Sequence, residues 1–449
     1  MRLEYMTSST LPIQFVLCGR AEFRPGTYPS KPGGNGADFG ESAPARLNRP
    51  ASGWVRMVGL FVIAGLCEVC TYGQITAFTP LHLPEIGVAP ADVAFWVGAI
   101  TAASNVVGLP FLPFWGALAD RYGRKPLIVR SYVVAFAAMG LATIAPNVLL
   151  FGVSRGIQSL GLGNTGLMLA TLAEHAPASR VGLAFGLVNG ANPVGAFLGP
   201  LIGGPVVDRL GFGWLVAADA VVMAAVVALL SFGYRDAFVP PRPQGSILRM
   251  AREGVMVIIR SPRLRALFPA YFVFFAGWLL AYIYIPLVVE RIYVGPDPAT
   301  AIGIVFGAGG LATLVASPAI GALADRIGHW RTLFLGGSAM VALWVLPYFA
   351  RELVSFTLLW ALANAIVSGV FSVSFNVLSD STTDETRGRV MTFGYLPANA
   401  GFVIGPGIGS ILASIDVFLV FPGAAALTAL GLLTLVYAYR QPVSSAANA

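Results

Sequence analysis

The sequence contains few charged residues. Asp, Glu, Lys and Arg make up 11% of its 449 residues, and 56% of the residues are hydrophobic. Charged residues make up about 25% of a soluble domain, so this composition excludes a surface that lies in water and predicts a chain embedded mostly in lipid. A bilayer offers backbone amides no hydrogen-bond partners, which leaves helices or closed barrels. Apolar runs of about 20 residues favour helices and exclude a barrel.

Residues that bind metals or carry out catalysis are also scarce. The sequence holds three cysteines and three histidines. Three cysteines are too few for a disulfide framework. Cys67 and Cys70 have no second pair to complete a zinc site, which needs about four ligands. No nucleophile is accompanied by a base. We therefore expect no metal, no cofactor and no enzymatic activity.

The net charge of +7 does not indicate a nucleic-acid partner, because the basic residues fall mostly in short loops on one side of the predicted helices. This bias is a signal of membrane topology. The basic residues on that side are Arg121, Arg124, Lys125, Arg180, Arg235, Arg242, Arg249, Arg252, Arg260, Arg263, Arg265, Arg326, Arg331, Arg387, Arg389 and Arg440. The other side holds Arg209, Arg291 and Arg351. We expect the first side and both termini to be cytoplasmic, in the cell (inner) membrane.

What the sequence does contain is an internal repeat. Residues 116–126 read GALADRYGRKP and residues 321–331 read GALADRIGHWR. The two copies start 205 positions apart (321 − 116), each between long apolar runs. Copies in corresponding places of two apolar halves predict a duplicated membrane protein, which is the outline of a transporter rather than an enzyme.

Twelve apolar runs are long enough to cross a hydrocarbon core of about 30 Å. They lie near 55–80, 93–115, 127–146, 148–172, 181–205, 212–234, 266–289, 299–320, 332–350, 354–378, 389–413 and 415–438. We predict an all-α transmembrane fold of twelve helices in two pseudo-symmetric six-helix bundles, related by an axis along the membrane normal. The predicted segments are a disordered cytoplasmic tail (1–52), a first bundle (53–235), a cytoplasmic linker (236–265), a second bundle (266–440) and a short cytoplasmic tail (441–449).

Over about residues 55–440, the chain resembles the major facilitator superfamily, and within it the twelve-span bacterial drug/proton antiporters of the multidrug efflux type. The loop at 116–125 is similar to the family signature Gly-x-Leu-Ala-Asp-Arg-x-Gly-Arg-Lys. The resemblance implies a gating motif in which Asp120 meets the start of the eleventh span. The residues assigned to this motif are Gly116, Asp120, Arg121, Gly123, Arg124, Lys125, Asp325, Arg326, Arg387 and Arg389. In the second copy His329 and Trp330 replace the Arg-Lys pair, so we expect a weaker latch there; the alternative for both copies is a charged loop that only sets topology.

The fifth run is similar to the family's antiporter motif, Gly-x-x-x-Gly-Pro-x-x-Gly-Gly. The matching residues are Gly195, Gly199, Pro200, Gly203 and Gly204. In the family the full motif accompanies export by exchange, and a face of small residues permits close helix contact. The alternative is general small-residue packing, since residues 405–409 of the eleventh run repeat part of the pattern.

Three ionisable residues that lie deep inside the apolar runs of the first half are the predicted proton-coupling residues: Glu68, Arg155 and Asp219. Glu68 lies about 14 residues into its run, near mid-bilayer, where desolvation disfavours a charged carboxylate; the alternative is that Glu68 only forms hydrogen bonds within the bundle. Arg155 is the one basic residue that we place deep in a run. Residues 155–161 resemble the family's Arg-x-x-Gln-Gly segment, which implies an influence on proton movement; a structural pair with Asp219 is the alternative.

The predicted substrate cavity combines polar residues of the first half with aromatic and amide residues of the second. The steps from Glu68 to Tyr72 and Thr76 place all three on one helical face, and Glu-x-x-x-Tyr is similar to the first span of multidrug/proton antiporters. Thr76 stands where some of those proteins carry a second acid. The cavity residues we assign are Glu68, Tyr72, Thr76, Gln158, Trp278, Tyr282, Asn364 and Asn376. A wall this apolar favours amphipathic molecules over sugars, which need many fixed hydrogen-bond partners.

We therefore expect a secondary active transporter that exports drug-like amphipathic small molecules from the cytoplasm in exchange for protons by alternating access, as a monomer in the lipid bilayer. One alternative is a facilitator, or a proton-coupled carrier, for a specific metabolite or lipid; sodium coupling also stays open. An alternative of another class is a membrane sensor on a transporter scaffold. A sensor needs a folded soluble domain of about 50 residues or more, which the predicted linker is too short to form.

Overall fold

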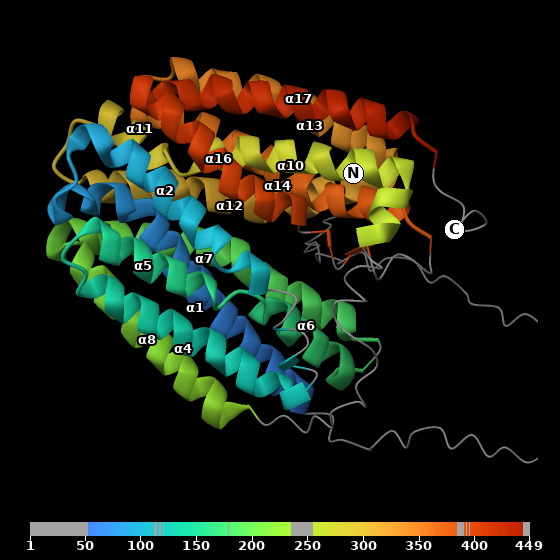
Figure 1. Cartoon of the computed structure of the whole chain (residues 1–449), viewed down its shortest axis with the longest axis horizontal. Helices are drawn as coiled ribbons and strands as arrows, with labels where there is room; N and C mark the ends of the chain where they lie inside the picture. Colours follow the sequence, from blue (N-terminus) through green and yellow to red (C-terminus); the bar gives the residue numbers. More distant parts are fainter. Residues whose placement is uncertain are drawn as a thin grey trace, which may run out of the picture. The chain divides into compact units, whose positions relative to one another are not determined.

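In the computed structural model, the described residues are 53–111, 115, 118–119, 121–177, 179–234, 255–383, 390–391, 393–394 and 396–442. These residues form helices and turns, with no strand among them (Figure 1). The predicted tail (1–52), most of the predicted linker (through residue 254) and residues 443–449 lie outside the described residues. The described end of the linker is partly helical, since residues 255–260 are helical and the next helix begins at Pro262.

The first half of the chain builds one helical bundle. Its α-helices are α1 (Gly53–His82), α2 (Val93–Val106), α4 (Arg124–Thr143), α5 (Val148–Ser159), α6 (Asn164–His175), α7 (Val181–Leu210) and α8 (Phe212–Gly233). Short 3-10 helices follow α1 and α2: η1 (Pro84–Ile86), η2 (Pro90–Asp92) and η3 (Leu109–Phe111). Within the bundle α1 packs on α7, and α4 packs on α8.

The second half builds the other bundle, drawn in yellow to red in Figure 1. Its α-helices are α10 (Pro262–Tyr282), α11 (Ile285–Ile292), α12 (Pro298–Ile327), α13 (His329–Val345), α14 (Leu353–Asp380), α16 (Leu396–Ile415) and α17 (Val420–Arg440). The 3-10 helices η4 (Leu346–Phe349) and η5 (Val417–Leu419) join neighbouring helices. The two bundles meet where α7 packs on α12 and where α2 packs on α16.

Ten helices among the described residues are long and apolar enough to cross a membrane. The other two predicted spans have a visible reason for falling outside this set. The run near 93–115 contains α2, but its end is only partly described. The run near 148–172 is divided into α5 and α6, each 12 residues long. The arrangement agrees with the predicted twelve-helix, two-bundle fold.

Glycines allow the break between α5 and α6. Gly163 has a φ of 99°, a left-handed conformation that favours glycine. At Gly161 a Cβ would lie 3.0 Å from the carbonyl oxygen of Ser131 on α4, so glycine lets the break pack closely against that helix without displacing its backbone.

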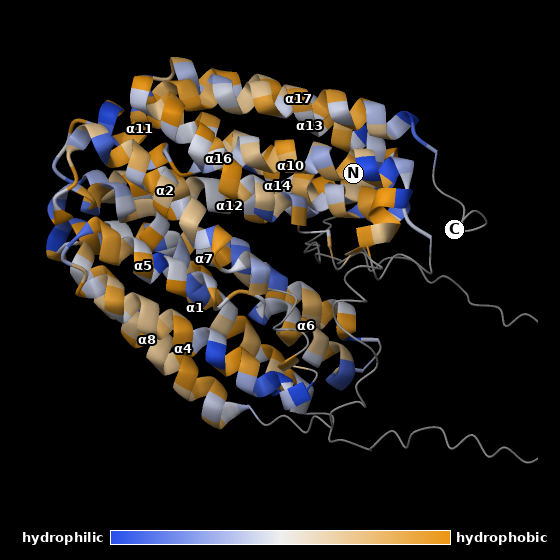
Figure 2. Ribbon diagram, in the orientation of Figure 1, coloured by the Kyte–Doolittle hydropathy of each residue, from blue (hydrophilic) through white to orange (hydrophobic). Residues whose placement is uncertain are grey.

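The distribution of hydropathy agrees with a membrane environment. Figure 2 shows strongly hydrophilic residues concentrated near the ends of the helices. Large apolar side chains are exposed along the outward faces, including Val221 and Phe232 on α8 and Leu433 on α17. Apolar surface this extensive is expected to contact lipid rather than water. The chain is therefore a multi-pass membrane protein.

Candidate functional site

A cavity of about 790 Å³ lies between the two bundles. The first bundle contributes Val69 of α1 and the α7 residues Asn189, Gly190, Asn192, Pro193 and Ala196. The second bundle contributes residues of α10, α12, α14 and α16: Trp278, Tyr282, Phe306, Gly309, Gly310, Thr313, Leu314, Ser317, Pro318, Asn364, Val367, Ser368, Phe371, Ser372, Phe375, Asn376 and Phe402. Four predicted cavity residues, Trp278, Tyr282, Asn364 and Asn376, therefore line it together.

Aromatic rings form one wall of this cavity. The ring centroids of Trp278 and Tyr282 are 5.3 Å apart, and those of Trp278 and Phe402 are 5.7 Å apart. Phe306 packs edge-on against Tyr282 at 5.2 Å. Such contacts fix the rings in place, so the wall is preformed rather than assembled around a bound molecule.

The bundles are joined at the end of the molecule predicted to face outward. Asp208, in the last turn of α7, accepts hydrogen bonds from the first turn of α12. Its Oδ1 is 3.0 Å from the backbone nitrogen of Ala299, and its Oδ2 is 2.7 Å from the backbone nitrogen and 2.6 Å from the hydroxyl of Thr300. Asn189 and Asn192 lie in the half of α7 that is nearer its predicted cytoplasmic end. The cavity thus lies between this junction and the predicted cytoplasmic end.

The sequence interpretation missed Asp208, although a signal was present. An acid in the last turn of a helix faces the negative end of that helix's own dipole. Asp208 holds this unfavourable position in α7 while capping the N-terminus of α12 in the other bundle. An acid at the C-terminal end of its own helix therefore indicates a hydrogen-bond donor in another part of the molecule.

Glu68 lies in a polar cluster inside the first bundle. Its Oε2 accepts a hydrogen bond of 3.0 Å from the hydroxyl of Tyr132 on α4 and one of 2.6 Å from the amide of Asn164, the first residue of α6. Tyr132 and Asn164 are buried. Glu68 does not line the central cavity, so the structure separates it from four of its predicted partners. The sequence interpretation missed both Tyr132 and Asn164.

Tyr72, Thr76 and Arg155 line a second, smaller cavity. Its volume of about 20 Å³ is enough for one water molecule. The Arg155 guanidinium lies over the Tyr72 ring at 5.2 Å from the centroid and donates a hydrogen bond to Oε1 of Gln158. These four predicted residues therefore lie together and outside the lining of the central cavity, with Tyr72 within electrostatic range of Tyr282 of the aromatic wall.

Asp219 does not pair with Arg155. The described residues contain no ion pair between the two, and Oδ2 of Asp219 is buried without a hydrogen-bond partner. Asp219 instead lies in α8 within electrostatic range of Cys70 on α1. The structural-pair interpretation of Arg155 has no support in this geometry, and a proton-coupling role for Asp219 stays a prediction.

The glycines of the predicted antiporter motif let α7 pack closely on α1 of its own bundle and on α12 of the other bundle. A Cβ at Gly199 would lie 2.6 Å from the carbonyl oxygen of Cys70 on α1, and one at Gly195 would lie 2.9 Å from Cβ of Val69. A Cβ at Gly203 would meet Gln74 at 2.6 Å. On the next face, a Cβ at Gly204 would lie 2.6 Å from the carbonyl oxygen of Ala299 on α12. Pro200 is buried between these contacts.

Part of the predicted gating motif lies outside the described residues, namely Gly116, Asp120, Arg387 and Arg389. Among its described residues, Gly123 has a φ of 95° at the start of α4. Arg124 forms an ion pair with Glu174 of α6, and Lys125 donates to the carbonyl oxygens of Ser231 and Tyr234 at the end of α8. Arg121 is exposed. These bonds hold the loop against its own bundle.

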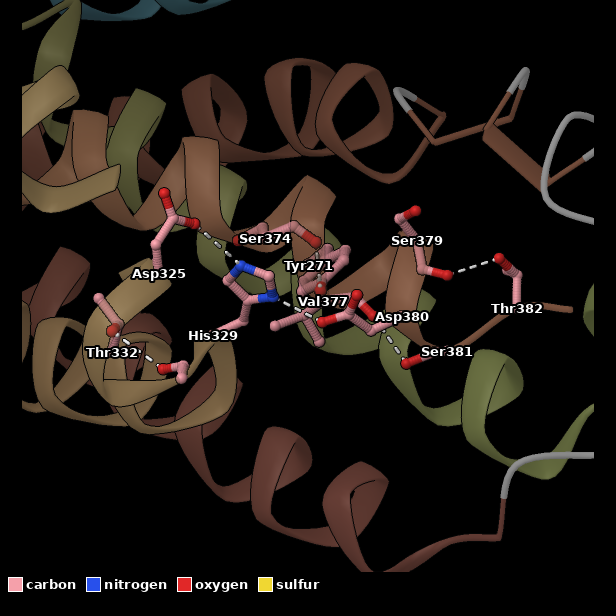
Figure 3. A network of polar contacts seen from close by, with 11 residues as sticks. Tyr271, Asp325, His329, Thr332, Ser374, Val377, Ser379, Asp380, Ser381 and Thr382 are labelled. Carbon is pink, nitrogen blue, oxygen red and sulfur yellow. Dashed lines mark hydrogen bonds and ion pairs between the residues drawn. The ribbon is translucent and has the colours of Figure 1, made fainter. Parts of the chain in front are cut away.

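The second copy of the motif makes a corresponding contact through a histidine (Figure 3). His329 begins α13, with Nδ1 2.6 Å from Oδ2 of Asp380 at the end of α14 and Nε2 3.7 Å from Oδ1 of Asp325. The preceding Gly328 has a φ of 96°, as Gly123 does in the first copy, and Arg326 is exposed. His329 corresponds to Arg124 in the repeat, so each copy binds an acid of its own bundle.

A second basic residue, which the sequence interpretation did not discuss, lies in the first half of the membrane helix α4. Arg130 is the seventh residue of α4, and its guanidinium lies 3.4 Å from the centroid of the Trp115 ring. The side chain also donates to the hydroxyl of Ser131 at 3.1 Å. Its position only six residues after Arg124 concealed it at the edge of a basic loop.

Comparison with known proteins places this geometry in a family. The sequence model described as "Major Facilitator Superfamily" matches residues 60–345 and 297–449. "Multidrug resistance protein MdtG" of Rahnella sp. (strain Y9602) is 28% identical over 381 residues, which cover 83% of this chain and 90% of that protein. The protein of the same name from Yersinia enterocolitica is 26% identical over 376 residues, covering 83% and 89%.

Two solved structures share the fold. The nucleoside transporter NupG superposes with a TM-score of 0.71 at 11% identity, covering 86% of this chain and all of that one. A D-xylose-proton symporter superposes with a TM-score of 0.69 at 16% identity, covering 87% and 99%. At these identities the likeness shows the fold alone.

Proposed function

Because this chain belongs to the Major Facilitator Superfamily, a family of transporters rather than enzymes, we propose that it is a secondary active transporter that exports amphipathic, drug-like molecules from the cytoplasm in exchange for protons. It acts as a monomer in the cell membrane with both termini in the cytoplasm. The name of its curated relatives, multidrug resistance protein, supports this direction and substrate type.

The observation that carries the proposal is the central cavity bordered by both bundles. Its volume of about 790 Å³ lies within the range of about 300–1,000 Å³ found for small-molecule pockets. Apolar and aromatic side chains dominate the lining, which suits amphipathic molecules. With Asp208 joining the bundles at the outer end, the arrangement corresponds to an inward-facing state that receives substrate from the cytoplasm.

Glu68 is the proposed proton carrier. As a carboxylate it accepts hydrogen bonds from Tyr132 and Asn164, and as a carboxylic acid one oxygen becomes a donor, so protonation changes how α1 is tied to α4 and α6. The next residue, Val69, lines the cavity. A shift of α1 on protonation therefore moves the cavity wall, which lets proton and substrate compete without touching.

The free energy available supports useful export. A proton moving down its gradient releases about 2.3 kcal/mol per 100 mV of potential and about 1.4 kcal/mol per pH unit. For an uncharged substrate exchanged for one proton, the sum allows a concentration ratio of a few-hundred-fold.

The test is gradient-driven transport by purified protein in proteoliposomes. Screening toxic compounds in an efflux-deficient host, with and without a protonophore, first identifies a transported compound. We expect wild-type protein to concentrate that compound when a pH gradient is imposed, and Glu68→Gln to insert normally but lose the response. Glu290→Gln, which alters an exposed acid in the last turn of α11, is the matched control. Gradient-driven export at the wild-type rate by Glu68→Gln contradicts the proposal.

A further inference from the structure

Building on the proposed function, we propose that the central cavity selects uncharged aromatic molecules that carry a strong hydrogen-bond acceptor, and that Asn364 is a specificity-determining residue. The basis is the combination of what the cavity lining contains and what it lacks. Three features of the described residues lead to this substrate class.

The first feature is the absence of charge. None of the described residues that line the cavity is acidic or basic. The nearest candidate acid, Glu68, is held by Tyr132 and Asn164 within the first bundle, and Arg155 lies over Tyr72 in the separate small cavity. A charged substrate would therefore lose hydration without gaining a counter-ion, which disfavours both cations and anions.

The second feature is unused hydrogen-bonding capacity. Four asparagines line the cavity, Asn189 and Asn192 on α7 and Asn364 and Asn376 on α14. The structure gives none of their side-chain amides a hydrogen-bond partner among the described residues. Asn364 is only 7% exposed, so little of its side chain is open to water.

The third feature is the arrangement of these groups. Amides face the cavity from both bundles, while the rings of Trp278, Tyr282 and Phe402 line it from the second bundle. The rings pack against one another, so part of each ring face is already covered and is not free to bind a cation. An aromatic molecule with an acceptor oxygen would place its rings on this wall and its oxygen at an amide.

A pair of probes with the same three phenyl groups tests the role of charge. Triphenylphosphine oxide carries an uncharged acceptor oxygen, and methyltriphenylphosphonium carries a methyl group and a positive charge in its place. Equilibrium dialysis of detergent-purified protein against the same detergent cancels partitioning into micelles. We expect the oxide to bind at least about tenfold more tightly than the phosphonium, and tetraphenylborate, an anion, to show no saturable binding. Equal or tighter binding of the phosphonium, or no saturable binding of the oxide, overturns the proposal.

A substitution tests the amide. Asn364→Leu should weaken binding of triphenylphosphine oxide about three- to tenfold, the loss of one hydrogen bond, and should leave triphenylmethane, which lacks the oxygen, bound as well or better. A structural defect would weaken both ligands alike, so equal weakening of both overturns the role of Asn364. Asn105→Leu is the control, because Asn105 bonds Thr101 in α2 and does not line the cavity.

This binding experiment is independent of proton exchange. Glu68→Gln protein should still prefer the oxide to the phosphonium, because Glu68 does not line the cavity, even though it fails to respond to a pH gradient. If the proposed substrate class is wrong, the protein will not bind the oxide, or will bind the oxide and the phosphonium alike, while it still exchanges protons for other compounds. Failure of the proposed function appears as wild-type transport that ignores the gradient.

Discussion

Asp208 and Thr300 join the two halves of the molecule: Oδ2 of Asp208, at the end of α7, lies 2.7 Å from the backbone nitrogen of Thr300 in the first turn of α12. The carboxylate also accepts the Thr300 hydroxyl and the backbone N–H of Ala299. An acid of one bundle thus caps a helix of the other. In the proposed alternating-access cycle this end opens, so we expect the cap to break once in every cycle.

We predict that Asp208→Ala shifts the protein toward the state that is open at this end. Loss of a helix cap removes about 0.5–2 kcal/mol, which corresponds to about a 2- to 30-fold change in the ratio of open to closed states. Spin labels at Leu210→Cys and Val294→Cys, in a background without the native cysteines, report the separation by pulsed electron resonance. We expect a larger fraction of long distances in the Asp208→Ala protein.

The control for this measurement is Asp416→Ala. Asp416 lies at the same end of the molecule and accepts a hydrogen bond from Phe418, but within the second bundle. It should leave the distance distribution unchanged. An Asp208→Ala distribution identical to wild type would show that the cap does not hold the closed state.

The second prediction concerns the hydroxyl of Tyr132, which donates a hydrogen bond of 3.0 Å to Oε2 of Glu68. A hydrogen bond to a charged group contributes about 1.5–3 kcal/mol. Tyr132→Phe removes it with little change of shape and should lower gradient-driven export about tenfold or more. In Glu68→Gln protein the same substitution should have no further effect, since residues that act through one interaction are not additive.

This cycle is measured as the initial rate of export from proteoliposomes for the four proteins, wild type, each single variant and the double variant. Tyr271→Phe is the control, since Tyr271 is also buried but donates its hydroxyl to a backbone carbonyl, that of Ser374 in the second bundle. Additive losses at Tyr132 and Glu68 would mean that the two residues act separately.

The sequence predicts the fold well because its signals are local. Apolar runs long enough to cross a bilayer, and a loop repeated at 116 and 321, give the number of helices and the duplication without any knowledge of packing. The break in the fourth predicted span was harder to predict. The apolar composition of this span continues through residues 160–163, and the left-handed backbone of Gly163 and the contact of Gly161 with α4 show why the helix is interrupted there.

The site was predicted only in part, because helical spacing identifies a face but not what that face contacts. Glu68 and Tyr72 are one turn apart, yet Glu68 contacts Tyr132 and Asn164 whereas Tyr72 contacts Arg155. Aromatic and amide residues of the second half were placed in the cavity by composition. The sequence interpretation missed Asn189 and Asn192. The sequence of α7 shows a glycine-rich face, but it does not show which of the other faces of the helix borders the cavity.

Close packing of α7 on α1 gives the last prediction. A Cβ at Gly199 would lie 2.6 Å from the carbonyl oxygen of Cys70 and 2.9 Å from its Cα, so backbone and not a flexible side chain would have to move. Gly186, thirteen residues earlier in α7, has no atom within 4 Å of such a Cβ. Gly199→Ala should therefore lower the free energy of unfolding by about 1–3 kcal/mol, whereas Gly186→Ala should leave it unchanged or raise it slightly, since alanine favours a helix.

Thermal unfolding of the two variants in the same detergent measures the difference, and export in proteoliposomes measures its consequence. Because α1 carries both Glu68 and the cavity residue Val69, forcing it away from α7 should also reduce export by Gly199→Ala. Equal melting temperatures for the two variants would mean that α1 and α7 separate without cost. In that case the glycine-rich face would set neither the position of α1 nor its coupling to the cavity.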